Sequence, residues 1–265
     1  MMKRKLNIIV LILIVAVITW GLFGEIVHGF TIFGVSMSDI GSLIGIFVII
    51  CLSFKMLKWI IEGFQLLFFP KSQRKLFNAM LDGLLKIRKK PAPRFQVPRK
   101  LRRAINKRRS VGDTEANLKY LTEQILIHMG LPKDSVKLNV IHSQHSSYSQ
   151  LGAGQIGRYL GAEREIEFIL TDDHKFWTIV AVLAHECAHH LHHLKGVNMK
   201  VHKYELYTDF TAIFYGFIKY LEKGYNMEKA EYFEDKVYTL RIGYLENRDY
   251  VYIRWLLFKH RFLRR

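Results

Sequence analysis

The hydropathy pattern divides the chain into an apolar beginning and a mixed remainder. Two long apolar runs, residues 6–23 and 40–57, are each of the length that crosses a membrane as a helix. The loop between them, 25–39, contains no Lys or Arg, and residues 59–70 are rich in aromatics, as in a helix that emerges through the headgroup zone. We therefore expect a transmembrane hairpin with an interfacial segment over residues 1–70. The rival interpretations are a signal peptide for the first run and a buried core helix for the second.

Beyond residue 110 the pattern alternates between helical and strand periods. Apolar residues at helical spacing predict a helix over 113–129 that Gly130 closes. Alternating residues predict strands over 136–141 and 164–170, joined by a Ser- and Gly-rich loop or hairpin turn at 143–161. Further helices are expected at 173–195, 204–221, 227–244 and 250–262, the first with N-cap candidates Thr171, Asp172 and Asp173 and a stop at Gly196. These elements predict an α+β domain over 111–265.

The positions of the basic residues predict an orientation for the expected hairpin. Lys3, Arg4 and Lys5 precede the first apolar run, and Lys71 and Arg74 follow the second. The positive-inside rule then predicts a two-pass protein of a bacterial-type inner or plasma membrane, with both termini and the folded domain in the cytoplasm. The cysteines agree with this, since the chain has 2 of them and neither belongs to a disulfide framework.

A dense basic segment lies within residues 71–110, which we expect to be a juxtamembrane linker. Its cations run from 86 to 109 without an acid and supply most of the net charge of +17. They are Lys86, Arg88, Lys89, Lys90, Arg94, Arg99, Lys100, Arg102, Arg103, Lys107, Arg108 and Arg109. Three prolines favour an interrupted, extended connector. We expect it to contact anionic lipid, whereas nucleic acid is disfavoured because aromatic residues are not interleaved with the cations.

The helix at 173–195 carries the chemical signal of the chain, His185-Glu-Cys-Ala-His189. Residues four apart lie on one face of a helix, so both imidazoles can bind one ion. Glu186 lies beside them, where a carboxylate can take a proton from an activated water. Cys187 should point away from this face as a small core residue. The competing interpretation is a histidine-rich helix end with adventitious metal binding.

A second helix offers the remaining ligand that a catalytic zinc site needs. Zinc in such sites takes three protein ligands and leaves a fourth position for water. Glu205 is the best candidate for the third ligand, and Asp209, one turn later, can accept an N–H bond from a ligand histidine and hold its ring. Exchanged roles for the two acids remain open. A carboxylate pair that only complements the helix dipole is the plainer alternative.

These two motifs resemble those of the gluzincin class of zinc metallopeptidases, in which a helix bearing His-Glu-x-x-His is followed by one bearing Glu-x-x-x-Asp. The chain is similar to ImmA/IrrE-like peptidases over roughly residues 135–220, including a histidine four residues after the second ligand, here His193. The expected membrane hairpin resembles that of HtpX-like membrane peptidases. The resemblance implies a zincin-like domain in which a strand edge beside the active-site helix binds an extended peptide.

The sequence thus predicts a membrane-anchored, zinc-dependent metalloendopeptidase. Zn²⁺ would be bound by His185, His189 and Glu205, with Glu186 as the general base and protein or peptide as the substrate. Four residues are candidates to stabilise the oxyanion, namely Tyr207, Tyr238, Arg241 and Tyr244. The alternative is a membrane-tethered regulatory or binding protein without enzymatic activity, in which a peptidase-like domain uses zinc for structure.

Overall fold

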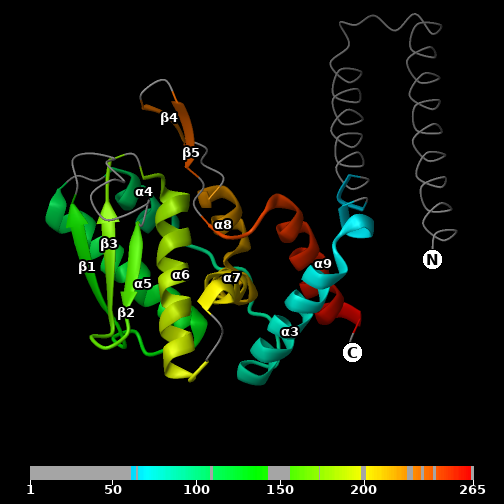
Figure 1. Ribbon diagram of the computed structural model, residues 1–265. Coiled ribbons are helices and arrows are strands. Elements are labelled where there is room, and N and C mark those ends of the chain that lie inside the picture. The colour runs from blue at the N-terminus through cyan, green and yellow to red at the C-terminus, as the bar shows by residue number, and fades with distance from the viewer. Residues whose placement is uncertain are drawn as a thin grey trace, which may run out of the picture. The chain divides into compact units, whose positions relative to one another are not determined.

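The computed structural model describes most of the chain from residue 61 onwards (Figure 1). The described ranges are 61–63, 65–107, 110–142, 156–172, 174–197, 201–225, 229–233, 236–240 and 243–263. The chain divides into two compact units, Met1–Pro70 and Lys71–Arg265. The second unit is a mixed α/β structure, with a small three-stranded sheet and mostly helices.

The sheet consists of β1 (Lys137–His142), β2 (Gly157–Leu160) and β3 (Glu165–Leu170), in the order β1-β3-β2. β1 pairs with β3 in parallel, with Val140 opposite Phe168, and β2 pairs with β3 in antiparallel, with Tyr159 opposite Ile166. β3 is central, and every second residue of it is buried. The predicted strands at 136–141 and 164–170 are confirmed, and β2 lies inside the segment that was expected to be a loop or hairpin turn.

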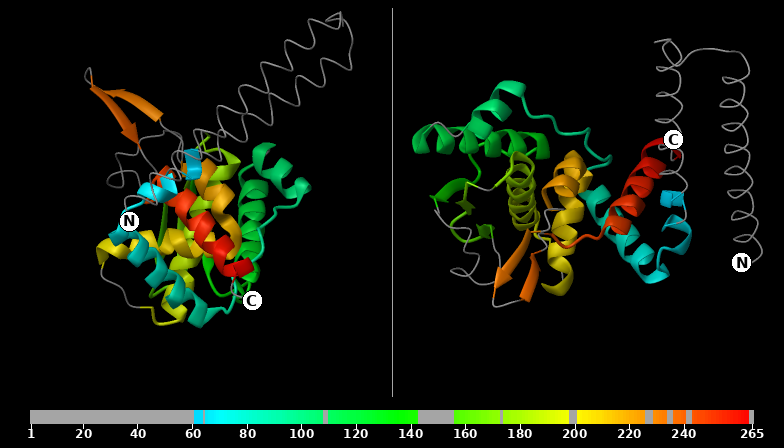
Figure 2. Two further views of the ribbon diagram at one scale, coloured as in Figure 1. Left: turned by 90° about the vertical axis from the view of Figure 1, so that its right-hand side faces the viewer. Right: turned by 90° about the horizontal axis from the view of Figure 1, so that it is seen from above.

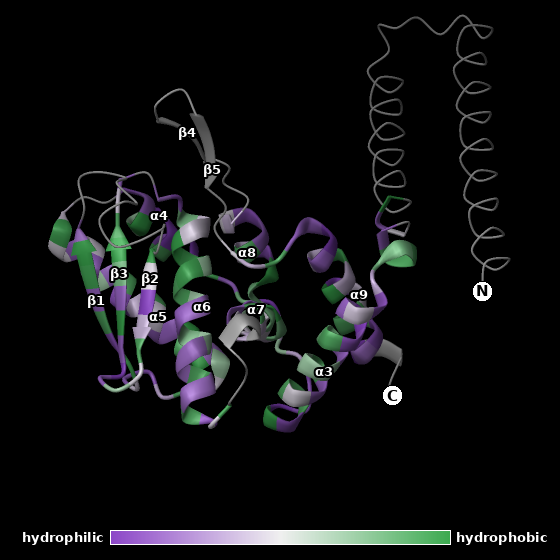
Figure 3. Ribbon diagram, viewed as in Figure 1, coloured by the Kyte–Doolittle hydropathy of each residue, from purple (hydrophilic) through white to green (hydrophobic). Residues whose placement is uncertain are grey.

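Helix α6 (Phe176–Leu194) is the core of this unit, with the sheet on one side and α7 (Val201–Ala212) and α8 (Ile218–Tyr225) on the other (Figures 1 and 2). Its N-terminal half is apolar, and hydrophilic bands appear towards its C-terminal end (Figure 3). The predicted cap is not used: the N-cap is Lys175, without a side-chain hydrogen bond. Gly196, in a left-handed conformation at φ 62°, follows the end of the helix as expected.

Helix α5 (Val111–Met129) packs against α6 and is the amphipathic helix that the sequence predicted. The Ser110 hydroxyl accepts a hydrogen bond from the Asp113 N–H at 3.2 Å, and Gly130 closes the helix at φ 78°. Its buried face includes Leu118, Leu121 and Ile125. This helix therefore forms as local patterning and capping dictate.

The predicted helix at 204–221 is interrupted by a π-helical segment, η1 (Ile213–Phe217), between α7 and α8. Gly216 inside it has φ 90°, and its carbonyl accepts a hydrogen bond from the Phe95 N–H at 3.2 Å. The Ala92 N–H likewise donates to the Phe214 carbonyl at 2.9 Å. The extended segment 91–98 thus attaches to η1, an interaction that helical periodicity alone does not indicate.

The basic segment differs from the extended linker that the sequence predicted. It contains α3 (Lys71–Ile87) and α4 (Arg99–Lys107), both of which belong to the second unit. Phe77 on α3 stacks on Phe210 of α7 with ring centroids 5.7 Å apart, and α4 buries Leu101 and Ile105. Apolar residues spaced among the cations give each helix a face that packs. The three prolines lie in the extended segment 91–98 between the two helices, where the predicted interrupted connector is confirmed.

The C-terminal part also departs from expectation. The predicted helix at 227–244 is replaced by a two-stranded antiparallel sheet of β4 (Lys229–Phe233) and β5 (Lys236–Leu240). The predicted helix at 250–262 is confirmed as α9 (Asn247–Leu263). Aromatic and β-branched residues in 227–244 suit a strand as well as a helix, so periodicity was ambiguous there.

Among the residues that the structure describes, no helix combines the length and apolarity needed to cross a bilayer. This finding contradicts the predicted two-pass membrane localisation, and the hairpin part of the predicted fold is unsupported. The two expected spans, 6–23 and 40–57, lie outside the described residues.

Candidate metal centre

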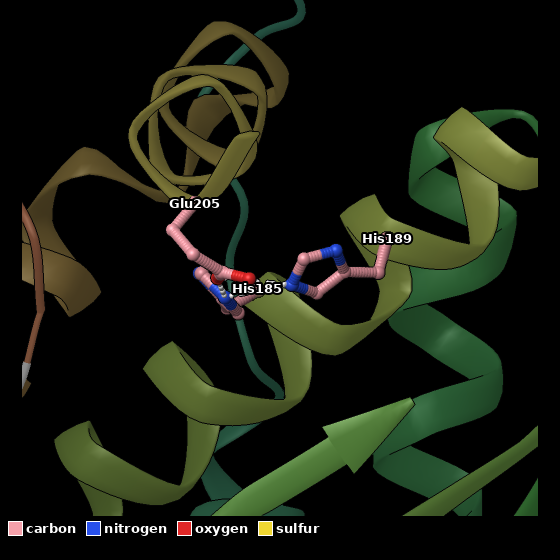
Figure 4. A group of neighbouring side chains, drawn as sticks. All are labelled: His185, His189 and Glu205. Carbon is pink, nitrogen blue, oxygen red and sulfur yellow. Dashed lines mark hydrogen bonds and ion pairs between the residues drawn. The ribbon is translucent and has the colours of Figure 1, made fainter. Parts of the chain in front are cut away.

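Helices α6 and α7 bring three potential ligands to one point (Figure 4). His185 Nε2 and His189 Nε2 are 3.0 Å apart, and Glu205 Oε2 is 3.0 Å from the first and 3.2 Å from the second. His185 is buried, and Glu205 retains about a third of its side-chain exposure. Of the two acids that the sequence left open for the third position, the structure puts Glu205 in this group.

Asp209 lies on the other side of the His185 ring. The His185 Nδ1–H donates to Asp209 Oδ1 at 2.7 Å, because an ionised carboxylate can only accept. Asp209 is fully buried and also accepts from the Tyr244 backbone N–H at 3.0 Å and from the Tyr225 hydroxyl. Three donors therefore fix this carboxylate, which in turn fixes the ring.

Thr208 sets the orientation of the second imidazole. Its hydroxyl donates its single proton to the Tyr204 carbonyl at 2.9 Å. The Thr208 oxygen can therefore only accept from His189 Nδ1–H, which lies 3.4 Å away. In the neutral forms of both rings, Nδ1 carries the proton and Nε2 presents a lone pair to the centre.

The three residues fit a small divalent cation. Two imidazole lone pairs and a carboxylate oxygen converge with no donor among them once both rings are neutral, and such a set of acceptors is stabilised by a cation. Tetrahedral bonds of about 2.0–2.1 Å place ligand atoms roughly 3.3 Å apart, close to the spacings in this group. The group could therefore hold a metal ion.

Electrostatics in the metal-free protein keep the three groups together. Burial lowers the pKa of His185, but the charge and hydrogen bond of Asp209, with the hydrogen bond of Glu205, outweigh burial and raise it to about 10. Burial raises the pKa of Glu205, but the interactions of its carboxylate with His185 and His189 outweigh burial and bring this pKa well below its usual range. Without an ion, a proton on His185 takes the place of the cation.

Glu186 is buried on the face of α6 that meets the sheet. Burial raises the pKa of its carboxyl, opposed by the charges of His185 and His189 and by a hydrogen bond from the Tyr159 backbone N–H. Strand β2 approaches closely at Gly157, where an added Cβ would lie 3.0 Å from Glu186 Oε1. The carboxylate is thus enclosed between the helix and β2, beside the metal ligands.

One of the four candidates for the oxyanion donor lies over the centre. The Tyr244 ring stacks on His185 with centroids 6.0 Å apart, and burial and nearby Glu205, Asp209 and Glu186 raise the pKa of its phenol. The Tyr207 hydroxyl instead faces Gly83 on α3. The side chains of Tyr238 and Arg241 lie outside the described part of the structure.

The other histidines of α6 are not part of this group. The His190 Nδ1 accepts from the Tyr159 hydroxyl at 2.9 Å, and the buried His192 ring stacks on Tyr207. His193 is exposed, with its ring 6.0 Å from that of Tyr159. Cys187 is buried away from the ligands, as expected, and burial raises the pKa of its thiol.

Three contributors to the site were missed from the sequence. Thr208 adjoins Asp209 in the second motif, so its position could have drawn attention to it. Gly157 was noted only as part of a glycine-rich stretch, and nothing local connects it to Glu186. Tyr225 bonds Asp209 across the π-helical segment, a contact that only the tertiary structure creates.

Comparison with protein-family models, curated proteins and solved structures finds no match to this chain.

Proposed function

We propose that the protein is a zinc-dependent metallopeptidase with a zincin-like domain. The observation that carries the proposal is the convergence of His185 Nε2, His189 Nε2 and Glu205 Oε2 beside the buried carboxyl of Glu186. Two imidazoles and one carboxylate on two helices form a donor set that suits zinc and leaves a coordination position open. A purely structural zinc site is closed and needs no buried base beside it.

The chain's own residues have distinct parts in the proposed reaction. His185, His189 and Glu205 hold the ion, and Asp209 and Thr208 keep the imidazoles in the ligating tautomer. Zinc, when bound, lowers the pKa of water and polarises a carbonyl. Glu186 takes the proton of the attacking water and passes it to the leaving amine, a task that its raised pKa favours.

Two further elements suit a peptide substrate. β2 is at one end of the described sheet and lies against α6, so an extended peptide can add to it through backbone hydrogen bonds. The Tyr244 phenol, kept protonated by its raised pKa, is our choice for the donor to the scissile carbonyl oxygen.

The proposal is tested with a peptide library incubated with the full chain, with and without a chelator. We expect cleavage that zinc restores after chelation. Glu186→Gln should retain stoichiometric zinc and lose at least about 10²-fold in hydrolysis, whereas His185→Ala should lose zinc as well. Full activity in either variant would refute the assignment. Zinc binding without any cleavage would favour the regulatory alternative.

A further inference from the structure

A cluster of cations surrounds the indole of Trp177, away from the metal ligands. Trp177 lies in the first turn of α6, whereas His185 and His189 lie in its second half. The Arg102 guanidinium carbon is 4.9 Å from the Trp177 ring centroid, Lys223 Nζ is 4.8 Å away and Lys219 Nζ is 5.7 Å away. Two helices that are distant in sequence, α4 and α8, thus direct their charges to one aromatic side chain.

Aromatic packing holds this cluster in place. Arg102 also lies 5.3 Å from the Phe176 ring centroid, so two rings support one guanidinium. Tyr220 contacts the Trp177 ring at 5.3 Å and accepts a hydrogen bond from the Val97 backbone N–H. The extended segment that carries Arg94 is thereby attached to α8. The cations are positioned by the fold rather than spread along flexible side chains.

Carboxylates of the described residues leave these positive charges without compensation. Within the described residues, none of Arg94, Arg102, Lys219 and Lys223 pairs with a carboxylate. The pKa of Lys219 is lowered, first by Arg94 and then by burial, Lys223 and Arg102, so every charged neighbour that shifts it is a cation. Such repulsion destabilises the fold, and a bound polyanion would relieve it.

α4 carries further cations besides Arg102, on other faces of the helix. Lys100, Arg103 and Lys107 line a pocket of about 390 Å³ between α4 and α5, where Asp113 is the acid among the lining residues. From its first to its last residue α4 spans about 12 Å. Cations that are spread over this length match an extended polyanion better than they match a single small anion.

We propose that this surface, defined by Arg94, Arg102, Trp177, Lys219 and Lys223 with the exposed cations of α4, binds the phosphate backbone of a single-stranded nucleic acid. Surfaces that bind such strands combine a basic track with aromatic side chains. The basic segment has a single aromatic residue among its cations, the buried Phe95, and the fold supplies further aromatic side chains from α6 and α8. The rings underlie the cations, so recognition is by phosphate and is independent of base sequence.

The test measures binding of the full chain to a fluorescent mixed-sequence RNA of about 12 nucleotides over a range of salt concentrations. We expect the slope of log affinity against log salt to be negative. The double variant Arg102→Glu/Lys223→Glu should bind at least about tenfold more weakly, with a slope about 1.4 smaller in magnitude. The matched control Lys137→Glu/Lys195→Glu changes two exposed cations elsewhere by the same charge and should bind as the unaltered chain does.

A milder variant, Lys219→Gln/Lys223→Gln, keeps the result interpretable if charge reversal impairs folding, and it should also weaken RNA binding. Equal losses in the cluster variants and the control would overturn the assignment. The assignment would also be overturned if poly-glutamate competed as strongly as unlabelled RNA. It would equally be overturned if the cluster variants changed only the binding to vesicles of equimolar phosphatidylserine and phosphatidylcholine and left RNA binding unchanged. The measurement does not depend on zinc or hydrolysis, so it stands apart from the peptidase proposal.

Discussion

Two acceptors on α7 decide which nitrogen of each neutral imidazole faces the candidate metal centre. Asp209 accepts from His185 Nδ1–H at 2.7 Å, and the Thr208 hydroxyl oxygen accepts from His189 Nδ1–H because its own proton is already donated to a backbone carbonyl. Both Nε2 atoms therefore present lone pairs to the same point. This preorganisation comes from residues that touch no metal themselves.

Removing the charge of Asp209 should loosen this arrangement. We expect Asp209→Asn to weaken zinc binding by about 10–100-fold, because an amide can present its N–H₂ to the ring and orient it wrongly. Competition with a zinc chelator measures the change. The exposed Asp82→Asn on α3 is the matched control and should bind zinc as the unaltered chain does. Unchanged affinity in Asp209→Asn would show that the ring is held by packing alone.

At the scale of elements, the contact between β2 and α6 encloses the proposed general base. Gly157 is the point of closest approach, since an added Cβ would lie 2.6 Å from Val182 Cγ1 and 3.0 Å from Glu186 Oε1. The Tyr159 N–H on the same strand bonds the Glu186 carboxylate. Two residues of β2, Gly157 and Tyr159, therefore constrain the position of this side chain, and the hydrogen bond from Tyr159 opposes the rise in its pKa that burial causes.

Gly157→Ala should consequently impair catalysis more than metal binding. The methyl group forces β2 and the helix apart, and displacements of about 1 Å in an active site can cost roughly 10²-fold in rate. We expect zinc stoichiometry to persist while hydrolysis falls at least about tenfold, as peptide cleavage by the zinc-loaded variant would show. Gly112→Ala, where the added Cβ meets nothing within 4 Å, is the control. Wild-type activity in Gly157→Ala would mean that β2 shifts to accommodate the methyl group without moving Glu186.

At the scale of the whole molecule, buried neutral histidine makes the fold sensitive to acid. His192 is fully buried, and its Nε2–H donates at 2.8 Å to Thr211, whose hydroxyl proton goes to the Tyr207 carbonyl. Burial, with the charges of His189 and His185, lowers the pKa of His192 to about 3. The unfolded chain takes up a proton near pH 6.5, whereas the folded chain resists it down to about pH 3.

The stability that the neutral His192 side chain contributes is therefore complete above pH 6.5 and is lost as the pH falls towards 3. Within this window it contributes about 1.4 kcal/mol per pH unit to the slope of the free energy of unfolding. His192→Phe, which can still stack on Tyr207, should remove that slope. Urea denaturation of the metal-free chain at several pH values measures it, with exposed His193→Gln as the control. Parallel pH profiles for His192→Phe and the unaltered chain would contradict the assignment.

The pattern of apolar and polar residues within a single helix or strand was sufficient to predict that element wherever its local preference agreed with its tertiary packing. α5 has a capping serine, an apolar face and a terminal glycine, and β3 has strict alternation, so both were predictable. The aromatic residues of segment 227–244 fit the period of a helix as well as that of a strand, so its hairpin of β4 and β5 was not predictable. In the basic segment, the prolines correctly indicated the extended stretch 91–98, whereas the apolar residues that let α3 and α4 form and pack on either side of it were overlooked.

The sequence by itself determined the candidate ligands: His185 and His189 share a helical face, and Glu205 and Asp209 are one turn apart on the next helix. Only the tertiary structure decided which acid joins the imidazoles, because that depends on how α7 crosses α6 rather than on spacing along either helix. It also decided that Gly157 encloses Glu186 and that Trp177 gathers cations from two helices. Helical periodicity fixes which residues share a face, whereas contacts between faces arise only when the whole chain packs.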